Sequence, residues 1–302
     1  MNIVFYHRHQ NGDTFTSRLF VKHFIEHTKN MEYKYFYTSD NSLESQCEDI
    51  GIPNENFNVF RPPPIQEGVV LHKEDNTLYI NLWISCSTHK ACIWCLDGYI
   101  KHYNDIIENL KSFGVHIDSI DENTVPFLPI KRESEYTIDP KYKKIVVYYN
   151  CKIKTYQHLN LVNHTMCLGN LADTHPDYLF VTFVDSGLPH ENVKTFASVV
   201  NGELPIEYGT DMANFCKRAD KVIFLPSGVS QLAFYNENNK KNKYAIFYYV
   251  AHPFLVPDNF ICEDRHTEHL CIDKFGYYVE KIWLENKSMV DIFNALDAFI
   301  TD

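Results

Sequence analysis

The chain has 302 residues, of which 45% are hydrophobic and 22% charged, the profile of a globular protein rather than a disordered or fibrous one. Its length predicts two domains or one large one. With 28 Lys and Arg against 39 Asp and Glu, the net charge is −11, so we expect no broad nucleic-acid-binding face.

In the first half of the chain, buried-strand patterns alternate with helical ones. Apolar runs predict strands at 2–6, 33–37 and 78–84. A polar loop is expected at 7–12. The i, i+3, i+4 spacing of apolar residues predicts a helix at 97–113, ended by Gly114 as a left-handed cap. A further helix is expected at 14–27.

A proline-rich segment at 126–143 brackets a charged run and predicts a domain boundary. We therefore expect a first domain at 1–132, a linker at 133–143, a second domain at 144–287 and a final helix within 288–302.

After the linker the alternation of strands and helices resumes. Strands are expected at 145–149, 178–183, 221–225 and 244–249, and helices at 156–171, 210–218, from 229 onward and at 288–300. Apolar strands alternating with amphipathic helices predict a doubly wound parallel α/β sheet in each domain. Ligands of such folds bind beyond the carboxyl ends of the strands, and we expect the cleft between the domains to be the site.

Glycine spacing and composition exclude several other classes. The chain has 11 glycines, none spaced as G-x-G, and it lacks the P-loop and the D-x-D metal–diphosphate signature. Its apolar runs are far below the roughly 18 residues of a membrane span, and no basic leader precedes the first one. We therefore expect a cytoplasmic protein with no transmembrane segment. Nine scattered cysteines argue against a disulfide framework.

The polar stretch after the first strand is the first candidate site. Asp13 follows the carboxyl end of the sheet, where a carboxylate could deprotonate a sugar hydroxyl. Asp is also a favoured helix N-cap, so a purely structural role competes with the catalytic one. His7 and His9 could form a metal pair, although polar loop residues are the simpler interpretation because no third ligand is nearby.

Two turns in the second half could bind an anion. The segment Ser227, Gly228, Val229, Ser230 and Gln231 follows a strand and opens a helix, where free N–H groups and the helix dipole attract phosphate. An ordinary strand–helix turn is the alternative. After the strand at 145–149, Asn150, Lys152 and Lys154 could neutralise a diphosphate, or the lysines could simply be solvated.

Cysteine and histidine also cluster twice, at Cys86, His89, Cys92 and Cys95 and at Cys262, His266, His269 and Cys271. Such spacings can bind zinc. The first cluster runs into a strong helix and contains apolar residues, so buried free cysteines are the preferred interpretation and no metal is expected.

The opening NIVFYHRHQNGDTFTSRLF, with its Gly12-Asp13 pair, resembles the start of heptosyltransferase-like enzymes of the GT-B glycosyltransferase superfamily. The segment ADKVIFLPSGVSQLA at 219–233 resembles their second-domain turn. The chain departs from the family in having Pro226-Ser227-Gly228 where Asp-Ser-Gly is usual, while Asp185-Ser186-Gly187 follows a different strand.

The resemblance implies two Rossmann-like domains facing across a cleft, with a final helix that can pack back on the first domain. It implies transfer of a sugar from a nucleotide-sugar to a glycan or other acceptor hydroxyl, with inversion and without metal or cofactor. Asp13 would be the base. The diphosphate would bind at 227–231 with Asn150, Lys152 and Lys154 nearby. The acceptor side would comprise His7, Arg8, His9, Gly12, Asn81 and Trp83.

Two other functions remain open. The same scaffold could be a non-catalytic sensor of nucleotides or carbohydrates, because one fold hosts unrelated functions. It could also be a sugar-nucleotide epimerase of GT-B shape, which would need cleft carboxylates. The candidates for those are Glu203, Glu207 and Asp211.

Overall fold

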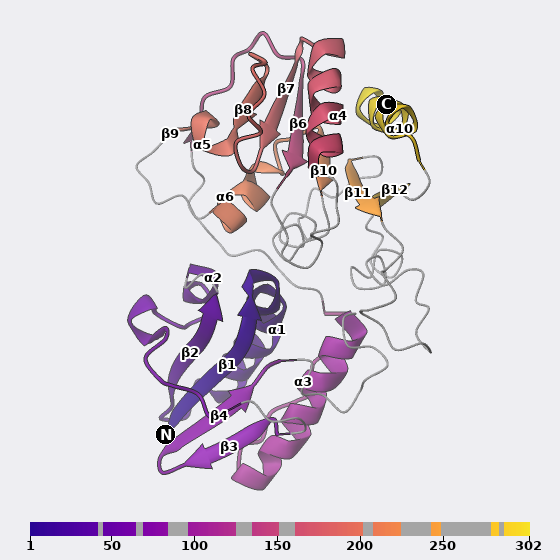
Figure 1. Cartoon of the computed structure of the whole chain (residues 1–302). Coiled ribbons are helices and arrows are strands. Elements are labelled where there is room, and N and C mark those ends of the chain that lie inside the picture. Colours follow the sequence, from indigo (N-terminus) through magenta and orange to yellow (C-terminus); the bar gives the residue numbers. More distant parts are fainter. Residues whose placement is uncertain are drawn as a thin grey trace. The chain divides into compact units, whose positions relative to one another are not determined.

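The computed structural model describes residues 1–41, 45–64, 69–83, 96–124, 135–150, 161–201, 208–224, 243–248, 279–283 and 287–302. The chain forms two compact units, and the first division between them along the sequence falls between Lys131 and Arg132 (Figure 1).

The first unit is built on a four-stranded sheet in the order β2-β1-β4-β3. β1 pairs in parallel with β2 and β4, and β3 adds an antiparallel edge, a common variant of a parallel sheet. Its strands are β1 (Asn2–Gln10), β2 (Lys34–Asn41), β3 (Leu71–Glu74) and β4 (Thr77–Asn81). Its helices are α1 (Asn11–Thr28), α2 (Ser45–Glu48), α3 (Leu96–Leu110) and the 3-10 turns η1 (Asn54–Asn56) and η4 (Lys111–Phe113).

Side chains of β1 alternate between the two faces of this sheet. Phe5 contacts Phe20 and Phe24 of α1, with ring centroids 6.1 and 5.4 Å away. Phe20 contacts Tyr103 of α3 at 5.4 Å, so both helices cover the same face. The opposite face carries the buried cluster Val4, Tyr6 and Tyr79, with Phe36 and Phe60 packed against it.

The strongest sequence pattern is confirmed in α3. The helix ends in the turn η4, and Gly114 follows with a φ of 75°, the left-handed conformation predicted for the cap. An L-residue with a side chain would be strained there, whereas glycine adopts this φ freely.

The second unit contains a six-stranded, wholly parallel sheet in the order β12-β11-β10-β6-β7-β8. Its strands are β6 (Lys144–Tyr149), β7 (Tyr178–Thr182), β8 (Val193–Thr195), β10 (Lys221–Phe224), β11 (Tyr244–Tyr248) and β12 (Val279–Trp283). Its helices are α4 (Leu161–Thr174), α5 (Phe196–Val199), α6 (Tyr208–Phe215) and α10 (Met289–Thr301). A separate pair joins β5 (Glu135–Tyr136) to β9 (Val200–Asn201).

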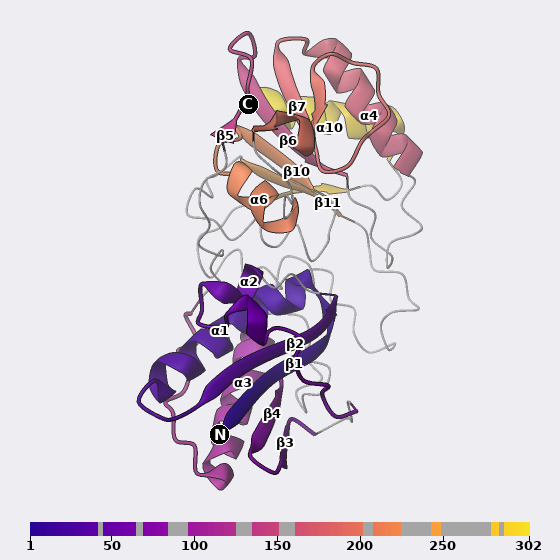
Figure 2. The ribbon, with the colours of Figure 1, turned by 90° about the vertical axis from the view of Figure 1, so that its left-hand side faces the viewer.

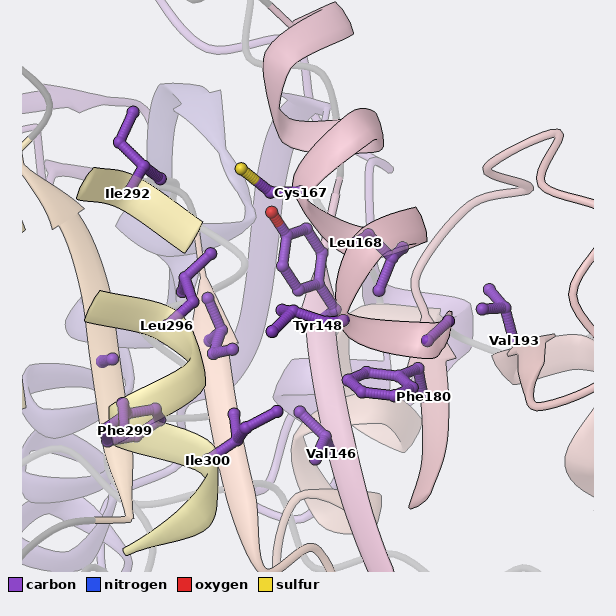
Figure 3. Close-up of a cluster of buried hydrophobic side chains, with 14 residues drawn as sticks. Val146, Tyr148, Cys167, Leu168, Phe180, Val193, Ile292, Leu296, Phe299 and Ile300 are labelled. Atoms are coloured by element: carbon purple, nitrogen blue, oxygen red, sulfur yellow. The ribbon is translucent and has the colours of Figure 1, made fainter. Parts of the chain in front are cut away.

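Helices cover both faces of the six-stranded sheet, as expected for a doubly wound fold. α4 and α10 pack on one face and α6 lies on the other (Figure 2). The first face buries side chains from β6, β7, α4 and α10 in one cluster (Figure 3). Val147 of β6 and Val181 of β7 alternate with the residues of this cluster, so they point to the opposite face of the sheet. Both are fully buried, so the sheet is apolar on both faces.

α10 uses its apolar face within the second unit. Ser288 caps the helix: its Oγ accepts a hydrogen bond from the Asp291 N–H, and the Asp291 carboxylate accepts one from the Ser288 N–H. Leu296, fully buried, joins the cluster beneath α4. His175 Nε2, at the end of α4, lies 2.5 Å from Asp297 Oδ1. These contacts lend no support to the expectation that the last helix packs on the first domain.

Part of the predicted linker is likewise integrated into the second unit. β5 pairs with β9, and Lys141 forms an ion pair with Glu191 before β8. Tyr136 also packs against Phe215 of α6, with ring centroids 4.8 Å apart. Residues 135–143 are therefore held by the second unit rather than spanning freely between domains.

Candidate functional site

In the first unit, the candidate acceptor residues lie at or just beyond the carboxyl ends of two neighbouring strands. After β1 the chain forms β2 on one side of it, and β4 later pairs with β1 on the other side. The direction in which strands are added to the sheet therefore reverses between β1 and β4. Ligands of open α/β sheets bind at such a switch point, beyond the carboxyl ends of the strands. Tyr6 pairs with Asn81, and the Leu82 N–H donates to the Tyr6 carbonyl at 2.9 Å. The segments 7–13 and 81–83 therefore begin side by side.

The loop predicted at 7–12 is absent. β1 continues to Gln10, because residues beyond Tyr6 keep pairing with β2: His7 opposes Ser39, and Gln10 opposes Asn41 after a register shift. α1 begins at Asn11, so Asp13 is its third residue rather than its N-cap. This puts Asp13 in the first turn, near the positive end of the helix dipole. The side chains of Arg8, His9 and Asp13 lie outside the described part of the structure, as does that of Gln10.

Two predicted acceptor residues are buried. His7 is 2% exposed and Asn81 is fully buried. The Asn81 side-chain oxygen accepts from the Trp83 N–H at 3.0 Å, and its amide nitrogen donates to the Val69 carbonyl at 3.5 Å. Asn81 thus stabilises the turn at the end of β4. Trp83 is partly buried at that turn.

In the second unit, the candidate donor residues again follow adjacent strand ends. β6 lies between β7 and β10, so the strand order reverses between β6 and β10. These two strands pair in parallel, with Tyr149 opposite Phe224 at their last residues. The segment that starts at Asn150 and the one that leads to 227–231 therefore leave the sheet together. Lys152, Lys154 and 227–231 lie outside the described residues.

Asn150 ties the end of β6 to the end of β7. Its side-chain oxygen accepts from the Val184 N–H at 2.9 Å, and its amide nitrogen donates to the Val184 carbonyl at 2.8 Å. The side chain thus continues the pairing of the two strands beyond Thr182. This fixes the point from which the lysine-bearing segment departs.

A third turn, at residues 185–187, lies at this edge of the sheet and was not among the predicted site residues. Asp185 Oδ1 accepts from the Gly187 N–H at 2.9 Å, and Gly187 has a φ of 67°. The turn follows Val184, which Asn150 holds. Its signal in the sequence is an Asp-Ser-Gly triplet that follows the strand predicted at 178–183. This is a different strand from the one that precedes the Asp-Ser-Gly turn in heptosyltransferase-like enzymes.

Other candidate sites receive no support from the described residues. Within those ranges, no three His, Cys, Asp or Glu side chains gather so as to hold a metal ion. The two cysteine–histidine clusters lie outside them. Among the described residues, Cys47, Cys167 and Cys216 are buried and free. No described helix is long and apolar enough to cross a membrane.

A hollow of about 510 Å³ in the first unit lies away from the candidate site. It is lined in part by His27, Lys111 and Asp118. His27 is at the end of α1 and Lys111 follows α3, and both helices start at the carboxyl edge of the sheet. The hollow therefore lies at the opposite, amino edge, far from Asp13.

No protein-family model matches this sequence, and no curated protein matches it. Solved structures do match. The structure of E. coli heptosyltransferase WaaC with ADP is similar over 100% of this chain and 99% of its own, with a TM-score of 0.52 and 11% identity. The same enzyme with ADP-2-deoxy-2-fluoro heptose has a TM-score of 0.50 and 10% identity, with the same coverage. A putative UDP-N-acetylglucosamine 2-epimerase from Listeria monocytogenes has a TM-score of 0.52 and 8% identity, over 100% of this chain and 88% of its own.

At these identities the likeness concerns the fold. It extends over the whole chain, and it agrees with a Rossmann-like sheet in each unit and with a strand-order reversal beside both sets of candidate residues. The expected resemblance to heptosyltransferase-like enzymes is thereby confirmed at the level of the fold, which this chain shares with the E. coli heptosyltransferase structures.

Proposed function

We propose that this protein transfers a sugar from a nucleotide-sugar to an acceptor hydroxyl. The observation that carries the proposal is the pairing of Tyr149 with Phe224, because the strands that precede the two candidate phosphate-binding segments then end side by side at one switch point. The GT-B fold supports it. So do the ligands of similar structures: one neighbour is described with ADP, and another is named for a UDP-sugar.

The donor's diphosphate would bind at 227–231. Main-chain N–H groups at a helix start and the helix dipole favour an anion, and Gly228 lets a phosphate approach the backbone. Lys152 and Lys154, leaving the neighbouring strand end, would neutralise the remaining charge. No divalent metal is required where preorganised N–H groups and lysines stabilise the departing diphosphate.

The acceptor would bind at the carboxyl edge of the first sheet. Asp13 in the first turn of α1 would take the proton of the acceptor hydroxyl as its oxygen attacks the anomeric carbon. The bond from that carbon to the diphosphate oxygen breaks, and the nucleoside diphosphate leaves with the electron pair. A single in-line displacement inverts the anomeric centre.

A sugar-nucleotide epimerase is the second candidate, because the Listeria epimerase matches this chain with the same TM-score as the heptosyltransferase. That activity needs carboxylates near the sugar. Asp211 lies in the first turn of α6 and is 8% exposed. Glu203 and Glu207 lie outside the described residues.

The test is a thermal-shift screen against a panel of nucleotide-sugars, followed by product analysis with the best ligand. A ligand at 100 times its Kd stabilises the native state by about 2.7 kcal/mol, which shifts the midpoint measurably. We expect stabilisation and slow release of free nucleoside diphosphate, accelerated by the right acceptor. Stabilisation with an epimerised sugar would favour the epimerase, and stabilisation without turnover a sensor. No stabilisation by any nucleotide-sugar would refute all three.

A further inference from the structure

The burial of His7 assigns it a role other than contact with the acceptor. Side chains along β1 alternate, and Phe5 faces α1 while Tyr6 faces the opposite side of the sheet. His7 has the parity of Phe5, so its ring points to the underside of α1. It is 2% exposed and lies edge-on to Tyr37 of β2, with ring centroids 5.7 Å apart.

A continuous polar network fills this apolar interface. His7 Nε2 lies 3.0 Å from Thr14 Oγ1. Ser17, one turn further along α1, donates from Oγ to the Thr14 carbonyl at 2.8 Å. Ser17 Oγ is also 2.6 Å from the Tyr37 hydroxyl, which must be the donor there because the serine proton is already used. Thr14, Ser17 and Tyr37 are each at most 1% exposed.

The network holds the start of α1 to two strands. Thr14 connects it to β1 through His7, and Ser17 connects it to β2 through Tyr37. Burial raises the pKa of the Tyr37 hydroxyl well above its ordinary value, so this group remains a hydrogen-bond donor. A buried network that is broken at one member leaves the others unsatisfied, which makes its geometry stiff.

We infer that His7 and Thr14 are positioning residues for Asp13, the neighbour of Thr14 in the first turn of α1. The inference rests on the proposed function. A general base must lie within hydrogen-bond reach of the proton it removes, and a displacement of about 1 Å can cost about a hundredfold in rate. The hydrogen bond between His7 and Thr14 fixes that turn against the strand whose end borders the acceptor site.

The test compares two buried threonines at opposite ends of α1. Thr14→Val removes the hydroxyl that meets His7. Thr28→Val is the matched control, since Thr28 is fully buried and its Oγ1 lies 2.9 Å from the Tyr35 hydroxyl. We expect Thr14→Val to lower kcat about tenfold or more with the KM for the donor within about twofold of wild type. Thr14→Ser, which keeps the hydroxyl, restores kcat, and Thr28→Val leaves it unchanged.

A second readout separates this inference from the proposed function. Amide hydrogen exchange of residues 11–18 should be faster in Thr14→Val than in wild type, while exchange in β7 is unchanged. If wild type turns over no nucleotide-sugar, glycosyl transfer is refuted, and hydrogen exchange alone then decides whether the network positions the first turn. If Thr14→Val is recovered unfolded, Ser17→Ala replaces it with the same expectations. Equal loss of kcat in Thr14→Val and Thr28→Val, or unchanged exchange at 11–18, would overturn the inference.

Discussion

Replacing Asp13 by Asn separates catalysis from helix stability. Asp13 is the third residue of α1, so it does not occupy the N-cap position. A carboxylate in the first turn of a helix interacts favourably with the positive end of the helix dipole, an effect worth about 0.3–1 kcal/mol at exposed sites. Asn removes this charge while keeping the size of the side chain.

The two roles of Asp13 predict effects of different size. Loss of a general base costs about 10²–10⁴-fold in rate, which corresponds to about 2.7–5.5 kcal/mol of activation free energy. Loss of the dipole interaction costs at most about 1 kcal/mol of folding stability and nothing in turnover. If Asp13 is the base, Asp13→Asn therefore remains folded and binds the donor, yet turns over slowly.

Asp291→Asn is the matched control. Asp291 is the third residue of α10, where hydrogen bonds from Ser288 hold the pKa of its carboxyl below the ordinary value. Its loss should disturb the capping box and leave turnover unchanged. The assay measures release of nucleoside diphosphate, donor affinity and thermal midpoint for both variants. Wild-type turnover in Asp13→Asn would refute the catalytic assignment, and His9 would be the next candidate because His7 is buried.

Four further predictions concern nucleotide binding, core packing, thiol chemistry and the need for a metal. Gly228→Val should weaken nucleotide affinity in a calorimetric titration without lowering the thermal midpoint, and unchanged affinity would contradict the phosphate site. Leu296→Ala should cost about 2–5 kcal/mol in denaturant unfolding, because this fully buried side chain fills the cluster under α4, and a loss below about 1 kcal/mol would contradict that packing. Burial raises the pKa of the Cys167 thiol to about 11 and that of the Cys216 thiol to about 12. Peptide mapping after alkylation at neutral pH should therefore find both thiols unmodified until the protein unfolds. Rapid labelling of the native protein would contradict this. Turnover should also persist in excess chelator, and its loss would establish a metal requirement.

Local patterns predicted most of the regular structure. The apolar run at 145–149 became β6 (Lys144–Tyr149), and the helix at 97–113 became α3 with its turn η4. Such patterns suffice because burial of one face or of both faces imposes a period on the sequence itself. The amphipathic run at 288–300 likewise became α10, shifted by one residue because Ser288 serves as its cap.

The strands that were missed are short or polar. β3 (Leu71–Glu74) reads LHKE and is antiparallel at a sheet edge, and β8 (Val193–Thr195) has only three residues. β12 (Val279–Trp283) reads VEKIW, with two adjacent charged residues, and lies at an edge of the six-stranded sheet. An edge strand is paired on one side only, so its residues need not be apolar throughout, and little in the local sequence marks it.

The candidate site, too, could be predicted from the sequence only in part. Chain order alone placed Asp13, Asn150 and the segment 227–231 after strands, which is why they could be proposed as ligand-binding residues. That His7 and Asn81 face inward could have been suspected from the two-residue period of a strand, but which face is covered by a helix depends on packing. Strand order is a non-local property: only the sheets as folded decide that β4 adjoins β1 and that β10 adjoins β6. The sequence therefore determined that the candidate segments follow buried strands, and the tertiary structure decided where β1 ends and which strand ends meet, because pairing is chosen by the burial of whole sheets and not by any one segment.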